Sequence, residues 1–373
     1  MVAAAFVAAC AVKLAPPPSL FPVTNAWKAA VGGLIEPPLA TDGTLLFVAT
    51  RDGLLALNLS DGKQAWKARG RGRVSAREGI VLLREGDGRV RRLDPATGAE
   101  QWRVASGVNG ELPAAIDGDL VFVAGDGLAA LSTGDGHKVW SSPEKISSLP
   151  VASGSQLFTG EEDGTVRRRD RATGTSRWTF ASVGAVKAPV FVDGDHALVG
   201  TSDRRFLALR AKKGTPRWRW KVGADITEPG SVLGHAALFV SYDNILYAVG
   251  RGNGHLRWRG VLPSRAISGP VLTGNAVVVA CLESDILGFD GRSGRSLGAL
   301  KTPAEIRTPP LVIGDRLYVG LRDRTVVALA LDQTPAPDAA PSPTPAPKAS
   351  TPPGATPPAA PAGAGKAAAK PTP

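Results

Sequence analysis

The segment Leu93-Asp94-Pro95-Ala96-Thr97-Gly98-Ala99-Glu100-Gln101-Trp102 is one copy of a repeat that runs through most of the chain. Its Gly precedes its Trp by four residues, and this spacing recurs in five of the other six copies, the copy at Trp27 being the exception. The Trp positions are 36 to 40 residues apart: Trp27, Trp66, Trp102, Trp140, Trp178, Trp218 and Trp258. Gly294 continues the series, with Gly298 in place of the next Trp. This period indicates a repeat architecture.

Each repeat contains short apolar runs such as Leu45–Ala49 and Val277–Ala280, bounded by turn residues. These runs are four to six residues long, which is typical of strands. An Asp recurs in a turn of each repeat, and a Pro stands at the head of one run in most repeats. The pattern predicts four strands per repeat, with the Pro-led strand innermost and the Trp-bearing strand outermost. Four strands in about 40 residues indicate a β-propeller blade.

The two ends of the repeat region complete one blade. The segment around Trp27 is an outer strand without a blade, and the runs after Gly298 lack an outer strand. We therefore predict an all-β, eight-bladed β-propeller over residues 22–333, with four antiparallel strands per blade and the last blade closed by the N-terminal strand. Closure removes free sheet edges. Each Trp is expected to fill one blade junction, and Gly298 predicts a weaker junction.

The two ends of the chain differ from the repeats. Residues 1–21 are interpreted as a signal and linker, because Val7-Ala8-Ala9-Cys10 resembles a bacterial lipobox. Export with lipidation of Cys10 is the prediction, and an ordinary chain end that contains a Cys is the alternative. Residues 334–373 are rich in Pro and Ala and lack large apolar side chains. Such a segment cannot offset its ordering entropy, so we predict a disordered tail.

The composition argues against several classes of site. The chain has two Cys and four His, which excludes a multi-disulfide scaffold and disfavours a Cys-rich or His-rich metal centre. No nucleophile elbow, zinc-protease motif or phosphate-binding loop occurs. We therefore expect no catalytic, cofactor-binding or metal-binding residues. The net charge is +11, but the Arg runs at 89–92 and 167–171 fall on strands of different blades. We interpret them as solvated strand edges and predict no nucleic-acid partner.

Residues 93–102 and 170–178 resemble the PQQ-like repeat, and the resemblance extends over everything but the two ends. Two kinds of eight-bladed relative matter, the quinoprotein alcohol dehydrogenases and the BamB lipoproteins of outer-membrane assembly. The dehydrogenases carry adjacent Cys residues, whereas Cys281 stands alone. The resemblance to BamB implies a monomeric, non-enzymatic scaffold of the periplasm or outer membrane that binds an envelope protein and needs no cofactor. A PQQ-dependent oxidoreductase and a ligand-sensing propeller remain alternatives.

Residues that differ between repeats are the candidates for partner binding. The loops between blades are expected to share a face with the Asp turns. On that face we single out Lys187, Asp225, Glu228, Tyr242 and Arg265. The Leu and Arg cluster through which BamB contacts its partner is not found in the comparable loops, so no contact residue is carried over from that family.

Overall fold

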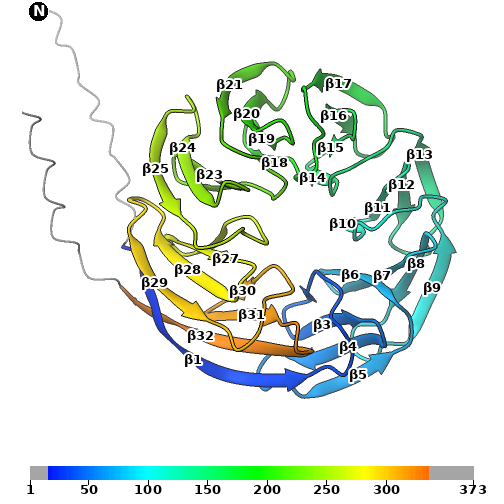
Figure 1. The fold of residues 1–373 in the computed structure, drawn as a ribbon. Coiled ribbons are helices and arrows are strands. Elements are labelled where there is room, and N and C mark those ends of the chain that lie inside the picture. The colour runs from blue at the N-terminus through cyan, green and yellow to red at the C-terminus, as the bar shows by residue number, and fades with distance from the viewer. Residues whose placement is uncertain (1–15, 336–373) are drawn as a thin grey trace, which may run out of the picture. The chain divides into compact units, whose positions relative to one another are not determined.

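The computed structural model describes residues 16–335, which form eight four-stranded antiparallel sheets arranged as a ring (Figure 1). The predicted all-β, eight-bladed propeller with a composite last blade is confirmed. Cys10 and residues 336–373 of the predicted tail lie outside the described residues. Residues 16–335 contain no helix with the length and hydrophobicity needed to cross a bilayer.

We number the blades in chain order, and each blade lists its strands from the innermost to the outermost. Blade 1 contains β2 (Ala40–Thr41), β3 (Leu45–Thr50), β4 (Gly53–Asn58) and β5 (Gln64–Ala68). Blade 2 contains β6 (Gly72–Arg77), β7 (Ile80–Glu85), β8 (Arg89–Leu93) and β9 (Glu100–Ala105). Blade 3 contains β10 (Ala115–Asp117), β11 (Leu120–Ala124), β12 (Leu128–Ser132) and β13 (Lys138–Ser142). Blade 4 contains β14 (Val151–Ser153), β15 (Gln156–Gly160), β16 (Thr165–Asp170) and β17 (Ser176–Ala181).

The remaining blades follow the same order. Blade 5 contains β18 (Phe191–Asp193), β19 (His196–Gly200), β20 (Arg205–Arg210) and β21 (Pro216–Lys221). Blade 6 contains β22 (Ser231–Leu233), β23 (Ala236–Ser241), β24 (Ile245–Gly250) and β25 (Leu256–Val261). Blade 7 contains β26 (Val271–Thr273), β27 (Ala276–Ala280), β28 (Asp285–Asp290) and β29 (Ser296–Lys301). Blade 8 contains β30 (Leu311–Ile313), β31 (Arg316–Gly320), β32 (Thr325–Pro335) and β1 (Pro18–Ala30).

The two middle strands of each blade form the core. Strands such as β11, β23 and β27 are buried along their whole length, because both faces of a blade pack against neighbouring blades. Their sequences are therefore continuously apolar rather than alternating. The outermost strands alternate, since only one of their faces reaches the neighbouring blade. In β5, for example, Trp66 is buried between exposed Ala65 and Lys67.

Each repeat Trp lies against a Gly of the next blade. Trp66 of blade 1 covers Gly98 of blade 2, where an added Cβ would lie 2.6 Å from the indole Cε3. Gly98 has a φ of 71°, a left-handed conformation that favours glycine. The Trp66 Nε1–H also donates to the Pro95 carbonyl at 2.8 Å. The other six repeat Trp residues donate in the same way to the carbonyls of Leu59, Thr133, Arg171, Ala211, Arg251 and Gly291.

Blade 8 is built from both ends of the described chain. β1 pairs antiparallel with β32, from Pro18 opposite Pro335 to Ala30 opposite Thr325. Both strands extend beyond the propeller boundaries of 22 and 333 that we expected from the sequence. The extension of β1 places Phe21 over Gly298, where an added Cβ would lie 2.8 Å from the Phe21 Cδ2. The junction at Gly298, which we expected to be weaker, is therefore filled by another aromatic side chain.

Candidate functional site on the loop face

The loops between blades and the turns between the second and third strands of each blade share one face of the ring, which we call the loop face. Within residues 16–335, backbone hydrogen bonds join seven of the eight loops to the turn of the following blade, blade 2 being the exception. The Arg51 N–H donates to the Leu34 carbonyl at 3.0 Å, and the Tyr242 N–H donates to the Asp225 carbonyl at 3.0 Å. Because this contact recurs around the ring, the scaffold holds variable side chains at fixed positions.

Tyr242 and Arg265 form the centre of a cluster on blades 6 and 7. The Arg265 guanidinium carbon lies 4.9 Å from the centroid of the Tyr242 ring, which is a cation–π contact. The Thr227 hydroxyl donates to the Tyr242 hydroxyl oxygen at 2.7 Å. Tyr242 therefore contacts residues of the loops on both sides of its turn and remains 38% exposed. Its ring presents a fixed apolar surface with a cation on it.

Glu228 lies next to this cluster. Its carboxylate accepts a hydrogen bond from the Thr227 hydroxyl at 3.4 Å. Burial raises the pKa of Glu228 to about 7, and the attraction of Arg265 only partly opposes this. A carboxyl group with such a pKa changes charge close to neutral pH. The cluster therefore combines an aromatic ring, a cation and a titratable acid.

The structure brings together four of the five loop residues singled out from the sequence. Asp225, Glu228, Tyr242 and Arg265 belong to the two consecutive loops and the turn between them. Lys187 is exposed in the loop between blades 4 and 5, where it forms no hydrogen bond or ion pair with residues 16–335. We define the Tyr242 cluster as Asp225, Thr227, Glu228, Tyr242 and Arg265.

Other apolar side chains are exposed on the same face. Val183, in the loop between blades 4 and 5, is 75% exposed, and Leu282, in the turn of blade 7, is 42% exposed. The Leu282 N–H donates to the Arg265 carbonyl at 2.9 Å, which ties Leu282 to the Tyr242 cluster. Sequence reasoning missed Leu282, although a Leu in an Asp-containing repeat turn is a signal that could have found it.

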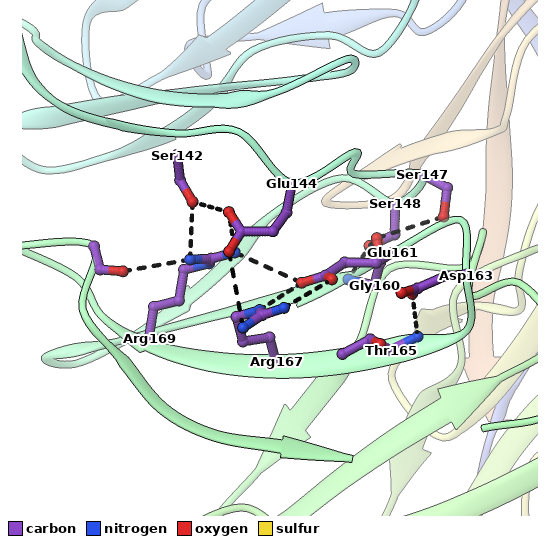
Figure 2. Close-up of polar contacts among 11 residues, drawn as sticks. Ser142, Glu144, Ser147, Ser148, Gly160, Glu161, Asp163, Thr165, Arg167 and Arg169 are labelled. Atoms are coloured by element: carbon purple, nitrogen blue, oxygen red, sulfur yellow. Dashed lines mark hydrogen bonds and ion pairs between the residues drawn. The ribbon is translucent and has the colours of Figure 1, made fainter. Parts of the chain in front are cut away.

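Two blades contain charged networks beneath the loop face. Figure 2 shows Glu144, Glu161, Arg167 and Arg169 pointing toward one another in blade 4. The Arg167 Nε and Nη2 bind the two oxygens of Glu161 at 2.6 and 3.0 Å, and the Arg169 Nη2 lies 3.3 Å from a Glu144 oxygen. Glu161 and Arg169 are buried. With two acids and two bases, the network has no net charge and fastens the loop before blade 4 onto the blade.

Blade 2 contains a related network, in which a Glu and an Arg also meet across the hairpin turn. Arg91 is buried and binds Glu100 at 2.8 Å and Glu85 at 3.4 Å. The interpretation of residues 89–92 and 167–171 as solvated strand edges was therefore wrong for Arg91 and Arg169. The sequence signal for these networks was a Glu six residues before an Arg, in both Glu85–Arg91 and Glu161–Arg167. This spacing spans a hairpin turn and brings the two side chains together.

Arg84 is a buried cation without a carboxylate partner among residues 16–335. It occupies a strand position at which the neighbouring blades have Ala49 and Ala124. Its guanidinium donates to the carbonyls of Val108, Leu112 and Ala124 at 2.6 to 3.1 Å. Burial lowers the pKa of Arg84. The side chain fills space beside Gly110, so we assign it a structural role.

The recurring Asp residues act within the scaffold. Asp163 and Asp323 each accept the N–H two residues later in their own turn, at 2.8 and 3.2 Å. Asp126 instead accepts from the Asn109 N–H of the preceding loop at 2.7 Å, and Asp243 accepts from the Gly223 N–H at 3.0 Å. The repeated Asp therefore has two structural roles: in some blades its carboxylate stabilises its own turn, and in others it binds the preceding loop.

Two observations concern the metal-ligating and thiol side chains of residues 16–335. Within 16–335, His, Cys, Asp and Glu side chains do not form a group of three that could hold a metal ion. Cys281 is buried, and burial raises the pKa of its thiol to about 11. A thiol with such a pKa stays protonated at neutral pH and is a poor nucleophile.

Comparison with known proteins places this geometry in a family. In curated proteins, 165 residues are 27% identical to the serine/threonine-protein kinase AfsK of Streptomyces griseus, covering 38% of this chain and 20% of the kinase. A second match, over 132 residues, is 29% identical to the outer membrane protein assembly factor BamB of Burkholderia pseudomallei and covers 31% of this chain and 34% of that protein. The matches thus span about a fifth and a third of these relatives.

Among solved structures, BamB from Moraxella catarrhalis superimposes with a TM-score of 0.73 at 19% identity, over 83% of this chain and 99% of that one. This similarity supports the fold. The family model described as outer membrane protein assembly factor BamB matches residues 24–143, 86–224 and 124–333, which together cover the whole ring. The chain therefore belongs to the BamB family of PQQ-like repeat propellers.

Proposed function

We propose that this protein is a non-enzymatic scaffold of the cell envelope that binds a protein partner in outer-membrane protein assembly. The observation that carries the proposal is the loop face of blades 5–7, where Tyr242, Leu282 and Arg265 are fixed by the scaffold yet accessible. Tyr and Arg are enriched at the energetic centres of protein interfaces. The family membership and the match to a named assembly factor support the biological context.

The interface is centred on the Tyr242 cluster. An exposed aromatic ring that is already held by Arg265 and Thr227 loses little conformational entropy when a partner covers it. Leu282 in the turn of blade 7 adds an exposed apolar side chain beside this cluster, and Val183 in the loop between blades 4 and 5 adds another on the same face. Lys187 in that loop and Asp225 in the cluster supply charges of both signs. A protein segment with apolar side chains and mixed charges fits this surface.

Location in the envelope is part of the proposal. The Val7-Ala8-Ala9-Cys10 segment motivates export and lipidation of Cys10, and the protein is proposed to act as a monomer in the periplasm or at the outer membrane. Mass spectrometry of the mature N-terminus tests this directly. A diacylated Cys10 is the expected result, and an unmodified Met1 in the mature protein would contradict it.

Site-specific photo-cross-linking in intact cells tests the binding surface. A photoreactive residue at position 242 or 282 is expected to capture a component of the outer-membrane assembly machinery. The same probe at position 67, on the outer strand of blade 1, serves as the control and should not capture it. Exclusive cross-linking at position 67, or capture of no envelope protein from positions 242 and 282, would reject the proposed surface.

A further inference from the structure

Positive charge is concentrated on two neighbouring blades. Residues 191–261, which include blades 5 and 6, contain eleven Lys and Arg against six Asp and Glu, a net charge of +5. Eight of these bases are exposed and form no ion pair with a carboxylate of residues 16–335, and six of the eight lie on the outermost strands or in the turn before β21. We call these six the basic rim: Lys212, Lys213, Arg219, Lys221, Arg257 and Arg259.

The basic rim lies on the outer edge of the ring, away from the centre of the loop face. Lys212 and Lys213 are in the turn before β21, and the others are on β21 and β25, the outermost strands of blades 5 and 6. Figure 1 shows these two strands next to each other on the convex circumference. A broad, flat surface can therefore approach both strands at once.

Apolar side chains lie among these bases. Leu256 and Val261, at the two ends of β25, are 47% and 75% exposed. Trp220 of β21 is half-buried against Tyr247, with ring centroids 5.1 Å apart. It stands outside the repeat series, and its indole N–H forms no hydrogen bond with residues 16–335, whereas all seven repeat Trp residues bind a carbonyl.

This combination matches the chemistry of a membrane interface. Lys and Arg side chains near an anionic bilayer each contribute about 1 kcal/mol of attraction. Trp prefers the headgroup level, where its ring is in an apolar environment and its N–H reaches a polar group. We propose that the basic rim, with Trp220, Leu256 and Val261, binds the surface of a membrane that contains anionic phospholipids.

The position of β1 is compatible with this orientation. Pro18, where β1 begins, lies beside Gly274 in the β26–β27 turn of blade 7, which is the neighbour of blade 6. Seven residues lie between Cys10 and Pro18, and the eight Cα–Cα steps span at most about 28 Å in an extended chain. A lipid at Cys10 would thus hold blades 6 and 7 near the bilayer, although the basic rim does not require it.

Vesicle binding by the full chain tests the proposal. Phosphatidylcholine vesicles with about a third of phosphatidylglycerol are expected to bind the protein, and pure phosphatidylcholine vesicles are expected to bind it weakly. The double variant Arg219→Glu with Arg259→Glu should weaken binding at least about thirtyfold, since each lost base accounts for about fivefold. Added salt should weaken the wild-type interaction through screening.

A matched control exists in the repeat. Arg219 and Arg259 each follow a repeat Trp by one residue, as do Lys67 and Arg103 on blades 1 and 2. Lys67→Glu with Arg103→Glu makes the same change in net charge at equivalent positions and should retain binding within about threefold. If both double variants lose binding equally, net charge rather than the basic rim is responsible, and the proposal is overturned.

Two further measurements keep the result interpretable. Thermal unfolding verifies that each variant folds, and Arg219→Gln with Arg259→Gln replaces the Glu pair if it does not. If the wild-type protein does not bind anionic vesicles but binds polyglutamate through these residues, the basic rim recognises an acidic polypeptide and the lipid proposal is wrong. Cross-linking from position 242 should persist in the rim variants, so failure here is separable from failure of the proposed partner surface.

Discussion

Seven blade junctions share one contact, and the junction between blades 7 and 8 is built differently. At the seven, a Trp on the outer strand of one blade covers a Gly in the turn of the next and donates to a carbonyl there. At the eighth, Gly298 takes the place of the Trp, and Phe21 and Leu20 from β1 cover Gly298 and Gly288.

The difference shows that the repeated contact needs both a Trp in one blade and a turn Gly in the next. Blade 8 takes its third and fourth strands, β32 and β1, from opposite ends of the sequence, so no turn connects them and no turn Gly is present. A Trp at position 298 would therefore have no Gly to cover. Leu20, which is completely buried, and Phe21 fill the junction from the side of the partner blade.

Removal of residues 1–30 is the most severe test of the closure of the ring by β1. Blade 8 would lose its outer strand, and the junctions on both of its sides would lose Phe21 or Trp27. We expect loss of cooperative thermal unfolding, measured by calorimetry, because an open ring exposes a strand edge. A chain ending at Pro335 serves as the control and should unfold at the wild-type midpoint. A cooperative transition within a few degrees of wild type for the first variant would show that closure is dispensable.

Truncation of one aromatic side chain at each kind of junction compares them directly. Trp66→Ala removes a buried indole and its hydrogen bond to the Pro95 carbonyl and should cost about 3–5 kcal/mol. Phe21→Ala should cost roughly half as much, because Phe21 is only half-buried. Urea unfolding measures both. Equal losses would mean that the two junctions are energetically equivalent despite their different construction.

The pH dependence of the free energy of unfolding distinguishes the loop face, which contains a titratable acid, from the junctions, which are apolar. Glu228 has a pKa of about 7 in the fold against an ordinary value of 4.5, so the folded state binds its proton more tightly. Stability from this group is complete below about pH 4.5 and is lost as the pH rises through 7. Glu228→Gln should therefore stabilise the protein by up to about 3 kcal/mol at pH 8.5 and have little effect at pH 4.

Phe21→Ala is the control for that measurement, since its cost should be the same at both pH values. A constant effect of Glu228→Gln across the range would show that the carboxyl group titrates at its ordinary value.

A single methyl group tests the Gly side of the regular junction. Gly98→Ala would place a Cβ 2.6 Å from the Trp66 ring and should cost about 2–3 kcal/mol, from the clash together with the positive φ. Gly194 also has a positive φ, 55°, but open space around its Cβ position. Gly194→Ala should therefore cost only about 1 kcal/mol in urea unfolding. If the two costs agree, the indole contact adds nothing to the requirement for glycine.

The sequence was sufficient to predict the ring because its pattern repeats. The spacing of Trp and Gly fixed the blade count, and the incomplete ends indicated the composite blade. The features that differ between blades were harder to predict. Phe21 and Gly298 are far apart in the chain and meet only after closure, and Arg91 and Arg169 gain burial from loops whose course the repeat does not determine.

The proposed partner surface was predictable only in part, because its residues also differ between blades. Tyr242 attracted attention because it is an aromatic residue in a turn that otherwise repeats small and charged residues. Its contact with Arg265 joins two blades, and such contacts depend on loop geometry rather than on periodicity. The basic rim could not be predicted from the repeat alone, because Lys67 and Arg103 also follow a repeat Trp. What distinguishes blades 5 and 6 is the number of exposed, unpaired bases on neighbouring outer strands, which depends on the fold.

The pairing of β1 with β32 also determines when the protein can finish folding. The first strand to leave a ribosome or an export channel must wait for the last one, since Pro18 and Pro335 are partners. Until then the remaining blades can stack on one another, but the ring retains two unpaired edges that invite aggregation or chaperone binding. During synthesis, and during the export that we propose, the interval between the arrival of these two strands is the period in which the chain is most exposed to aggregation.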